Sequence, residues 1–258
     1  MVPFRSVPPI AHRGLHDTRQ GVIENTASAF RAAIAGGYGI EADVQAAAGG
    51  EPVIFHDERL ERLTTGEGPV SAHTPDQLAR LPMRGTTDRI LTLSELLALV
   101  KGRAPLFLEI KSIKRTDRTL ERHIAQELAG YRGPVAVISF DPASLAAMRR
   151  FAPRIPRGLS AMRFWGPKDL GLSATDRFRL THMLDIGEAK PDFLTYEVDD
   201  LAVMGAALRR QFPDLPIVTW TVRTREERRK ANAFADGMIF EGFRPLSHGI
   251  REIRQRPV

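Results

Sequence analysis

The 258-residue sequence contains no cysteine, which excludes several kinds of site. Without a thiol there is no disulfide framework, no thiolate zinc site and no cysteine nucleophile. Any bound metal must therefore be held by carboxylates and histidines. Long apolar runs are also missing, because no segment approaches the ~20 consecutive apolar residues that span a bilayer. Prolines interrupt residues 1–9 where a signal peptide needs an apolar stretch, so we expect a cytoplasmic protein with no stable membrane anchor.

Aromatic residues are also scarce, at 7% of the chain, although Lys and Arg exceed Asp and Glu by 37 to 31. The net charge of +6 attracts anions in general. Basic residues concentrate in 223–230 and 251–256, and the first run is interleaved with Glu226 and Glu227, as on a solvated helix face. No aromatic cluster accompanies these runs as a stacking platform, so we predict no nucleic-acid partner.

Short apolar, β-branched segments alternate with helix-like segments along the whole chain, a pattern typical of a parallel sheet with crossover helices. Nine strands are predicted, at residues 9–12, 40–44, 52–56, 106–111, 135–140, 157–161, 193–198, 217–222 and 237–241. Only seven residues separate Val44 from Pro52, and a parallel crossover needs about a dozen. These two strands must form an antiparallel hairpin, which should place Ile54–His56 beside Glu41–Asp43. The other eight strands predict a (β/α)8 TIM barrel, with residues 1–258 as a single domain.

Several helices and two insertions can also be located. Thr92 and Glu95 have capping-box spacing before an apolar run, and Asp199–Asp200 precedes a helix at 201–211. Residues 57–91 form a small excursion after the hairpin, with one helix at 75–81. Residues 162–190 are predicted to be a second, irregular insertion. There, Phe164, Trp165 and Met183 either form an apolar lid for an acyl chain or pack the loop onto the barrel.

Charged side chains alternate with apolar ones on two of the predicted strands. Successive residues of a strand point to opposite faces. Glu41 and Asp43 therefore lie on the same face of their strand, and Glu109 and Lys111 lie on the same face of theirs. Their apolar neighbours must face the outer helices, which turns the charged residues into the barrel. Three carboxylates crowded together repel one another, so one must be protonated or a cation must lie among them. An all-oxygen set favours a divalent Mg²⁺ or Ca²⁺ ion.

Two histidines, His12 and His56, stand at the ends of predicted strands. An imidazole titrates near neutrality and can serve as a general acid or base. Arg13 adds a planar donor fork suited to a phosphate or carboxylate, and Gly14 permits a sharp turn or a close backbone approach. Each feature alone is typical of ordinary surface or packing. Their concentration at carboxyl ends of barrel strands, where such enzymes build their sites, favours a catalytic centre.

The motifs that carry these residues resemble the glycerophosphodiester phosphodiesterase family in order and spacing. They are Ala11-His-Arg-Gly14, Glu24-Asn-Thr26, Glu41-Ala-Asp-Val44, Pro52-Val-Ile-Phe-His-Asp57, Leu60-Glu-Arg62 and Leu108-Glu-Ile-Lys111, with weaker matches at Ser139-Phe140, Trp220-Thr-Val222 and Asp236-Gly237. The resemblance implies a metal-dependent (β/α)8 barrel that cleaves a small-molecule glycerophosphodiester to glycerol 3-phosphate and an alcohol.

Carried over by position, the resemblance implies that Glu41, Asp43 and Glu109 hold the ion and that His12 and His56 act as acid and base. It also implies that Arg13 and Lys111 neutralise the phosphate, while Trp220 either walls the substrate pocket or packs at the barrel rim. The chain departs from the family at residues 46–50, at Arg223 and near Glu241, which affects substrate choice. The alternatives are cleavage of a lysophospholipid or another phosphodiester lipid headgroup, and a non-catalytic barrel that binds an anionic metabolite.

Overall fold

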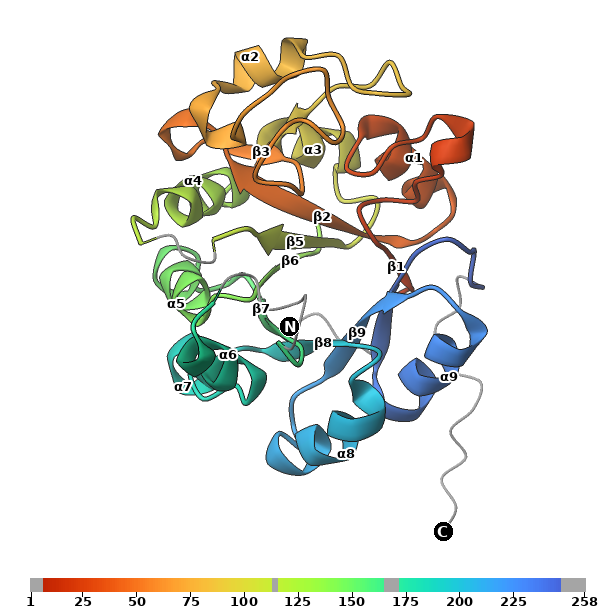
Figure 1. Ribbon diagram of the computed structural model, residues 1–258, viewed down its shortest axis with the longest axis vertical. Coiled ribbons are helices and arrows are strands. Elements are labelled where there is room, and N and C mark those ends of the chain that lie inside the picture. The colour runs from red at the N-terminus through yellow and green to blue at the C-terminus, as the bar shows by residue number, and fades with distance from the viewer. Residues whose placement is uncertain (1–6, 113–115, 165–171, 247–258) are drawn as a thin grey trace.

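Eight parallel strands close into a barrel in the computed structural model, which describes residues 7–112, 116–164 and 172–246. In order around the barrel they are β1 (Ile10–Ala11), β2 (Gly39–Ala46), β5 (Leu106–Ile110), β6 (Val135–Ser139), β7 (Arg157–Ala161), β8 (Phe193–Glu197), β9 (Ile217–Val222) and β10 (Gly237–Phe240). The barrel closes at β1, where Ile10 lies opposite both Gly39 and Ile239. The predicted TIM barrel is confirmed (Figure 1).

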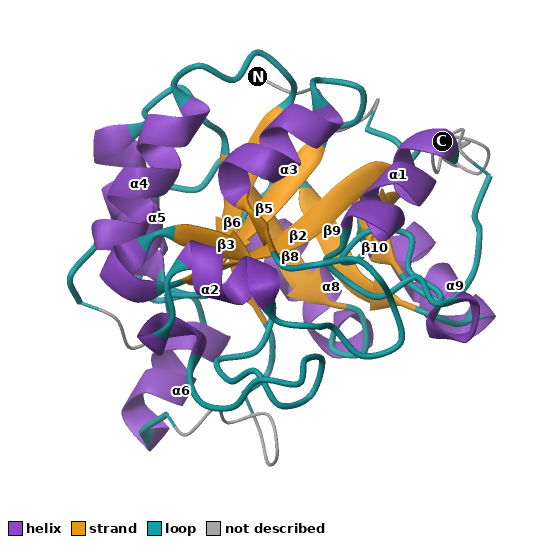
Figure 2. Ribbon diagram, turned by 90° about the horizontal axis from the view of Figure 1, so that it is seen from above, coloured by secondary structure: helices purple, strands orange, loops and turns teal. Residues whose placement is uncertain are grey.

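Helices surround the strands on the outside (Figure 2). They are α1 (Ala27–Ala35), α3 (Leu93–Val100), α4 (Thr119–Leu128), α5 (Pro142–Phe151), α6 (Ala174–Thr181), α7 (Ile186–Ala189), α8 (Leu201–Gln211) and α9 (Arg225–Phe234). The predicted capping box of Thr92 and Glu95 opens α3. Helix α8 has the predicted bounds, but the carboxylate of its N-cap residue Asp200 accepts a hydrogen bond from the Arg163 backbone N–H instead of capping the helix.

The two faces of the strands bury different cores. Ile40, Ala42 and Val44 of β2 pack with Leu106, Leu108 and Ile110 of β5 in the cluster that includes residues of the outer helices. This arrangement confirms the predicted outward face. The barrel interior holds a smaller apolar cluster, in which Phe107 and Phe193 meet edge to face with ring centroids 5.9 Å apart. This cluster fills the interior, so the polar residues at the carboxyl ends of the strands stand above a closed apolar core.

The predicted hairpin between β2 and β3 (Pro52–Ile54) is present and antiparallel. Its predicted register is wrong by one residue, because Ile54 lies opposite Val44 and not Asp43. The turn explains the shift: Ala47 N–H donates to Glu51 O, and the 3₁₀ turn η3 (Ala48–Gly50) spans the gap with positive φ at Gly49 and Gly50. A short strand β4 (Leu91–Thr92), which the sequence did not indicate, pairs with β3.

The excursion after the hairpin has its own apolar core, in which Phe55, Leu60, Val70 and Leu78 are buried. It contains η4 (Val70–Ala72) and α2 (Pro75–Arg80), so the predicted helix is confirmed with an end one residue earlier. A further turn, η2 (Thr18–Gln20), lies between β1 and α1.

The second insertion was wrongly predicted to be irregular, because α6 and α7 lie within it. Two of the three residues of the predicted lid, Phe164 and Met183, are only 2% and 4% exposed and pack into the molecule. Trp165, the third, lies outside the described residues. None of the described helices has the length and apolar character needed to cross a bilayer.

Candidate active site

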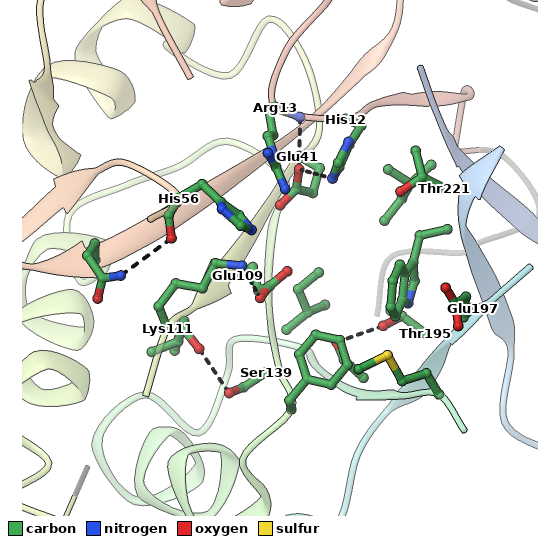
Figure 3. Close-up of a pocket in the computed structure, with 18 of the residues that line it drawn as sticks. His12, Arg13, Glu41, His56, Glu109, Lys111, Ser139, Thr195, Glu197 and Thr221 are labelled. Atoms are coloured by element: carbon green, nitrogen blue, oxygen red, sulfur yellow. Dashed lines mark hydrogen bonds and ion pairs between the residues drawn. The ribbon is translucent and has the colours of Figure 1, made fainter. Parts of the chain in front are cut away.

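A cavity of about 610 Å³ opens at the carboxyl ends of the barrel strands. Its lining includes seven of the eight predicted site residues, namely His12, Arg13, Glu41, His56, Glu109, Lys111 and Trp220. The eighth, Asp43, is 1% exposed and is not part of the lining, but its carboxylate is grouped with those of Glu41 and Glu109, which are. Figure 3 shows Arg13, Glu41, Glu109 and Lys111 on one side of the cavity, with Thr195, Glu197 and Thr221 across from them. The structure therefore brings together the side chains that the sequence distributes over 209 positions, from His12 to Trp220.

The three carboxylates converge as the strand alternation predicted. Oxygens of Glu41, Asp43 and Glu109 lie within 4.8 Å of one another. Register places Asp43 opposite Glu109 on neighbouring strands β2 and β5. The Arg13 backbone N–H donates to Glu41 Oε2 at 2.8 Å, but Glu41 Oε1 is buried with no hydrogen-bond partner among the described residues. A buried carboxylate oxygen without a partner is costly unless a cation reaches it.

Two cationic side chains already approach the cluster. Lys111 Nζ lies 2.8 Å from Asp43 Oδ1 and 2.5 Å from Glu109 Oε1, and Arg13 Nε lies 3.2 Å from Asp43 Oδ2. Burial alone would raise the pKa of Asp43, but the Lys111 and Arg13 charges outweigh burial and hold that pKa well below its usual value. Burial, followed by the charges of Asp43 and Glu109, raises the pKa of Glu41 well above its usual value. The cluster is therefore incompletely neutralised at Glu41.

This donor set fits a hard divalent cation. Three converging carboxylates supply only oxygen ligands, and one of those oxygens is buried and unpartnered. Mg²⁺ and Ca²⁺ prefer such ligands, whereas zinc favours nitrogen and sulfur. The side-chain amide of Asn25 donates to Asp43 Oδ2 at 2.7 Å and so fixes one carboxylate of the set.

Both histidines are held through Nδ1 by a carboxylate. His12 Nδ1 lies 2.7 Å from Glu241 Oε2, and His56 Nδ1 lies 2.7 Å from Asp57 Oδ1. His12 Nε2 lies 4.0 Å from Glu41 Oε2, and both rings point toward the carboxylate cluster (Figure 3). Burial lowers the pKa of His12, and the hydrogen bond from His12 lowers the pKa of Glu241 to about 2. A carboxylate at Nδ1 fixes the ring orientation and leaves Nε2 free for proton transfer.

The backbone at Arg13 and Gly14 makes this arrangement possible. Arg13 has φ +53° and Gly14 has φ +79°, a region in which side chains other than glycine are strained. A Cβ on Gly14 would lie 2.8 Å from Ala29 Cβ, so the close approach predicted from sequence is present. The turn directs Arg13 back over the cluster, where Nη1 donates to Glu24 Oε1 at 2.7 Å.

The opposite wall of the cavity is less charged. Trp220 meets Phe140 edge to face, with ring centroids 5.5 Å apart, and Trp220 Nε1 has no hydrogen-bond partner among the described residues. Thr195 donates to Ser160 Oγ at 2.7 Å beside it. Arg223 stands at the mouth with Nη2 3.2 Å from Glu241 Oε2. This wall offers an aromatic surface and hydroxyl groups to whatever part of a ligand lies away from the carboxylates.

Four further residues contribute to the site, namely Glu24, Asn25, Asp57 and Glu241, and the sequence analysis gave none of them a role although the first three stand in the quoted motifs. Each contacts a predicted residue, and Glu241 does so from 229 positions away in the chain. A signal for Glu241 was available, since it follows the last barrel strand at the same rim as His12. The barrel closes between those two strands, and that neighbourhood could have suggested their pairing.

Comparison with known proteins gives consistent matches. The family model described as the glycerophosphoryl diester phosphodiesterase family matches residues 12–242. A Caldanaerobacter subterraneus protein named "Glycerophosphodiester phosphodiesterase" is 34% identical over 160 residues, which are 58% of this chain and 65% of that protein. A Mycobacterium tuberculosis protein named "Probable glycerophosphodiester phosphodiesterase 1" is 30% identical over 225 residues, which are 77% of this chain and 79% of that protein.

Solved structures share the fold. An Oleispira antarctica phosphodiesterase in complex with the product sn-glycerol-3-phosphate matches with a TM-score of 0.72 and 20% identity, covering 93% of this chain and 94% of that chain. A glycerophosphodiester phosphodiesterase from Thermotoga maritima matches with a TM-score of 0.68 and 24% identity, covering 91% of this chain and 94% of that chain. At these identities the structures bear on the fold alone.

Proposed function

This chain belongs to the glycerophosphoryl diester phosphodiesterase family of phosphoric diester hydrolases, and we propose that it hydrolyses glycerophosphodiesters to glycerol 3-phosphate and an alcohol. We further propose that it uses a divalent cation and two histidines. The observation that carries the proposal is the convergence of His12, His56 and three carboxylates in one cavity. The Mycobacterium tuberculosis relative, which is 30% identical and is named "Probable glycerophosphodiester phosphodiesterase 1", supports the substrate class.

In this proposal Glu41, Asp43 and Glu109 hold Mg²⁺ or Ca²⁺. The ion supplies fixed positive charge for the phosphoryl oxygens, on which negative charge grows during the reaction. Arg13 and Lys111 lie on the same side of the cavity and add to that charge. Both cations are anchored, Arg13 by Glu24 and Lys111 by Asp43 and Glu109, so little reorganisation is needed when the phosphate binds.

The two histidines transfer protons. One neutral imidazole accepts the proton of the attacking hydroxyl at Nε2, and the other donates a proton to the departing alcohol oxygen. Glu241 and Asp57 hold the Nδ1 atoms and stabilise each ring when it carries a positive charge. The attacking oxygen is that of water, or that of the glycerol 2-hydroxyl if a cyclic phosphate forms first. By the water route these two proton transfers complete the hydrolysis. By the cyclic route they release the alcohol and leave a cyclic phosphate, which water then opens to glycerol 3-phosphate with the acid and base roles of the two histidines exchanged.

We favour water-soluble glycerophosphodiesters over lysophospholipids. A lysophospholipid needs an apolar surface for its acyl chain, and Phe164 and Met183, which could have offered one, are buried. The cavity's own apolar lining consists of Ile110, Ile138, Phe140, Met162, Trp220 and Ile239, which lie among charged and hydroxyl-bearing side chains.

The direct test is a hydrolysis screen with the full chain. Chelator-treated protein receives glycerophosphocholine or lysophosphatidylcholine, with Mg²⁺, Ca²⁺ or no cation. A coupled dehydrogenase assay detects glycerol 3-phosphate, and a coupled oxidase assay detects the choline that cleavage of either substrate releases. We expect glycerol 3-phosphate from glycerophosphocholine only when a cation is restored. Turnover that persists in chelator contradicts the cation requirement. Cleavage of lysophosphatidylcholine alone supports the lipid alternative, and binding of substrate without turnover with either cation supports the non-catalytic barrel.

A further inference from the structure

A second group of metal-binding side chains lies beside the carboxylate cluster. Ligand atoms of His12, His16 and Glu241 lie within 4.8 Å of one another. His12 and His16 come from the segment after β1, and Glu241 follows β10, the strand that pairs with β1. Glu241 is the centre of the group: its Oε2 lies 2.7 Å from His12 Nδ1, and the charge of His16 contributes to its lowered pKa.

The two clusters differ in ligand chemistry. Glu41, Asp43 and Glu109 offer only oxygen, whereas the second group offers two imidazole nitrogens and one carboxylate. Imidazole favours zinc and other late transition metals, whereas an all-carboxylate set favours Mg²⁺ or Ca²⁺. Two histidines and one carboxylate with an open fourth position is a recognised zinc-binding set. No hydrogen bond joins the His16 side chain to another described residue, so a metal ion would not have to displace one there.

We propose that His12, His16 and Glu241 form a second metal site that binds a zinc-class ion and that an ion bound there inhibits the enzyme. The binding itself is independent of the catalytic roles proposed above. The inhibition rests on the proposed role of His12.

Inhibition follows from the proton positions on His12. In the described arrangement Nδ1 faces Glu241, so a neutral ring carries its proton there and offers a lone pair at Nε2. A metal at Nδ1 takes the lone pair of that nitrogen, and the proton must then reside on Nε2. The ring still points at the cavity but can no longer accept a proton. The ion therefore blocks proton transfer without entering the carboxylate cluster.

Two adjustments accompany metal binding. The His12 Nδ1 to Glu241 Oε2 distance of 2.7 Å must open, since two ligands on one tetrahedral zinc at about 2.0–2.2 Å stand roughly 3.4 Å apart. Arg223, whose Nη2 lies 3.2 Å from Glu241 Oε2, must turn away. Its side chain is half exposed and at the mouth, so it can move into solvent.

The test distinguishes the two metal sites by filling the Glu41, Asp43 and Glu109 cluster with Ca²⁺. Zinc binding to chelator-treated protein is measured by calorimetry in excess Ca²⁺, and Co²⁺ replaces zinc for an absorption spectrum of the ligand set. The diagnostic variant is His16→Gln, which leaves all proposed catalytic residues in place. The matched control is His182→Gln, which removes an exposed histidine of the second insertion.

In excess Ca²⁺ we expect one zinc per wild-type or His182→Gln chain. Binding to His16→Gln should be roughly 100-fold weaker or more, because losing a ligand should cost at least as much as losing a residue that only orients one. Without zinc, His16→Gln should hydrolyse substrate at a rate within about twofold of wild type. The zinc concentration that halves its activity should rise by the same factor as its dissociation constant for zinc. Equal zinc affinity in wild type and His16→Gln would overturn the site, as would complete displacement of zinc by Ca²⁺. Zinc that binds through His16 without slowing hydrolysis would overturn the inhibition. Calorimetry needs no substrate, so absence of hydrolysis would count against the proposed function and not against this site.

Discussion

The barrel and the hairpin segment that leads into the excursion each place one histidine at the same cavity, and the two histidines are held differently. His12 is fixed by Glu241 from the neighbouring strand end, a contact that exists only when the barrel is closed. His56 is fixed by Asp57, the next residue, on a segment that packs over the separate apolar core of Phe55, Leu60 and Leu78. His12 is 13% exposed, and His56 is 33% exposed. One of the two proposed proton carriers therefore depends on the closed barrel, while the other depends on local packing.

Removing either histidine should have the largest effect. We expect His12→Asn and His56→Asn each to lower turnover by ~10²–10⁴-fold, the usual contribution of a general acid or base. Steady-state hydrolysis of glycerophosphocholine measures the loss, with circular dichroism to check folding and His182→Asn as the matched control. Near wild-type turnover in either folded variant would remove that residue from the mechanism and leave only one histidine as a proton carrier.

Truncating one aromatic residue in each region sharpens the comparison. Phe55 and Phe107 are 1% and 2% exposed, in the excursion core and the barrel interior respectively. Each change to Ala should cost about 3–5 kcal/mol of unfolding free energy if the whole chain unfolds together. We expect Phe55→Ala instead to raise amide hydrogen exchange mainly in residues 53–91, because that segment has its own core. Equal exchange increases across all barrel strands in Phe55→Ala would show that the excursion and the barrel unfold as one unit.

The carboxylates behind the histidines provide a finer test. Glu241→Gln should lower kcat by about 10–100-fold with little change in KM, since it weakens the hold on His12 without removing the ring. Asp57→Asn should cost less, because His56 is more exposed and water can replace the lost partner. Glu241→Asp should recover part of the loss. A rise in KM with unchanged kcat in Glu241→Gln would instead indicate a role in substrate binding, through Arg223.

The inward direction of the charged residues was predictable because it depends only on strand alternation. Glu41, Asp43, Glu109 and Lys111 each stand next to apolar residues whose burial against the helices fixes the other face. The hairpin followed from the short link between Val44 and Pro52. Its register did not, because the 3₁₀ turn at Ala48–Gly50 leaves no periodic signal.

Other features lay beyond the reach of local pattern. Strand β4 has two residues, too few to show alternation, and its pairing with β3 spans the whole excursion. The contact of Glu241 with His12 depends on barrel closure between β1 and β10, so the predicted barrel topology could have suggested it but no local pattern could. Helix α6 has a mostly polar sequence with exposed Phe178, so an apolar stripe did not mark it. In these three cases the tertiary structure decides which side chains are buried and which pair with one another.

The smallest predicted effect is on the pH dependence of the unfolding free energy, and it arises where the hairpin turn meets the barrel helix α4. Burial, and then the charge of Glu51 on the turn, raise the pKa of Glu127 to about 7. In the unfolded chain a glutamate titrates near 4.3, so between these two values the folded state binds more protons and stability falls as pH rises. Because the side chain is only half buried, the loss should be about 1 kcal/mol, complete above pH 7. Glu127→Gln should remove this pH dependence, and urea unfolding at pH 5 and pH 8 measures it. An equally large change in stability between pH 5 and pH 8 in the variant would mean that the turn and the helix do not couple through this carboxylate.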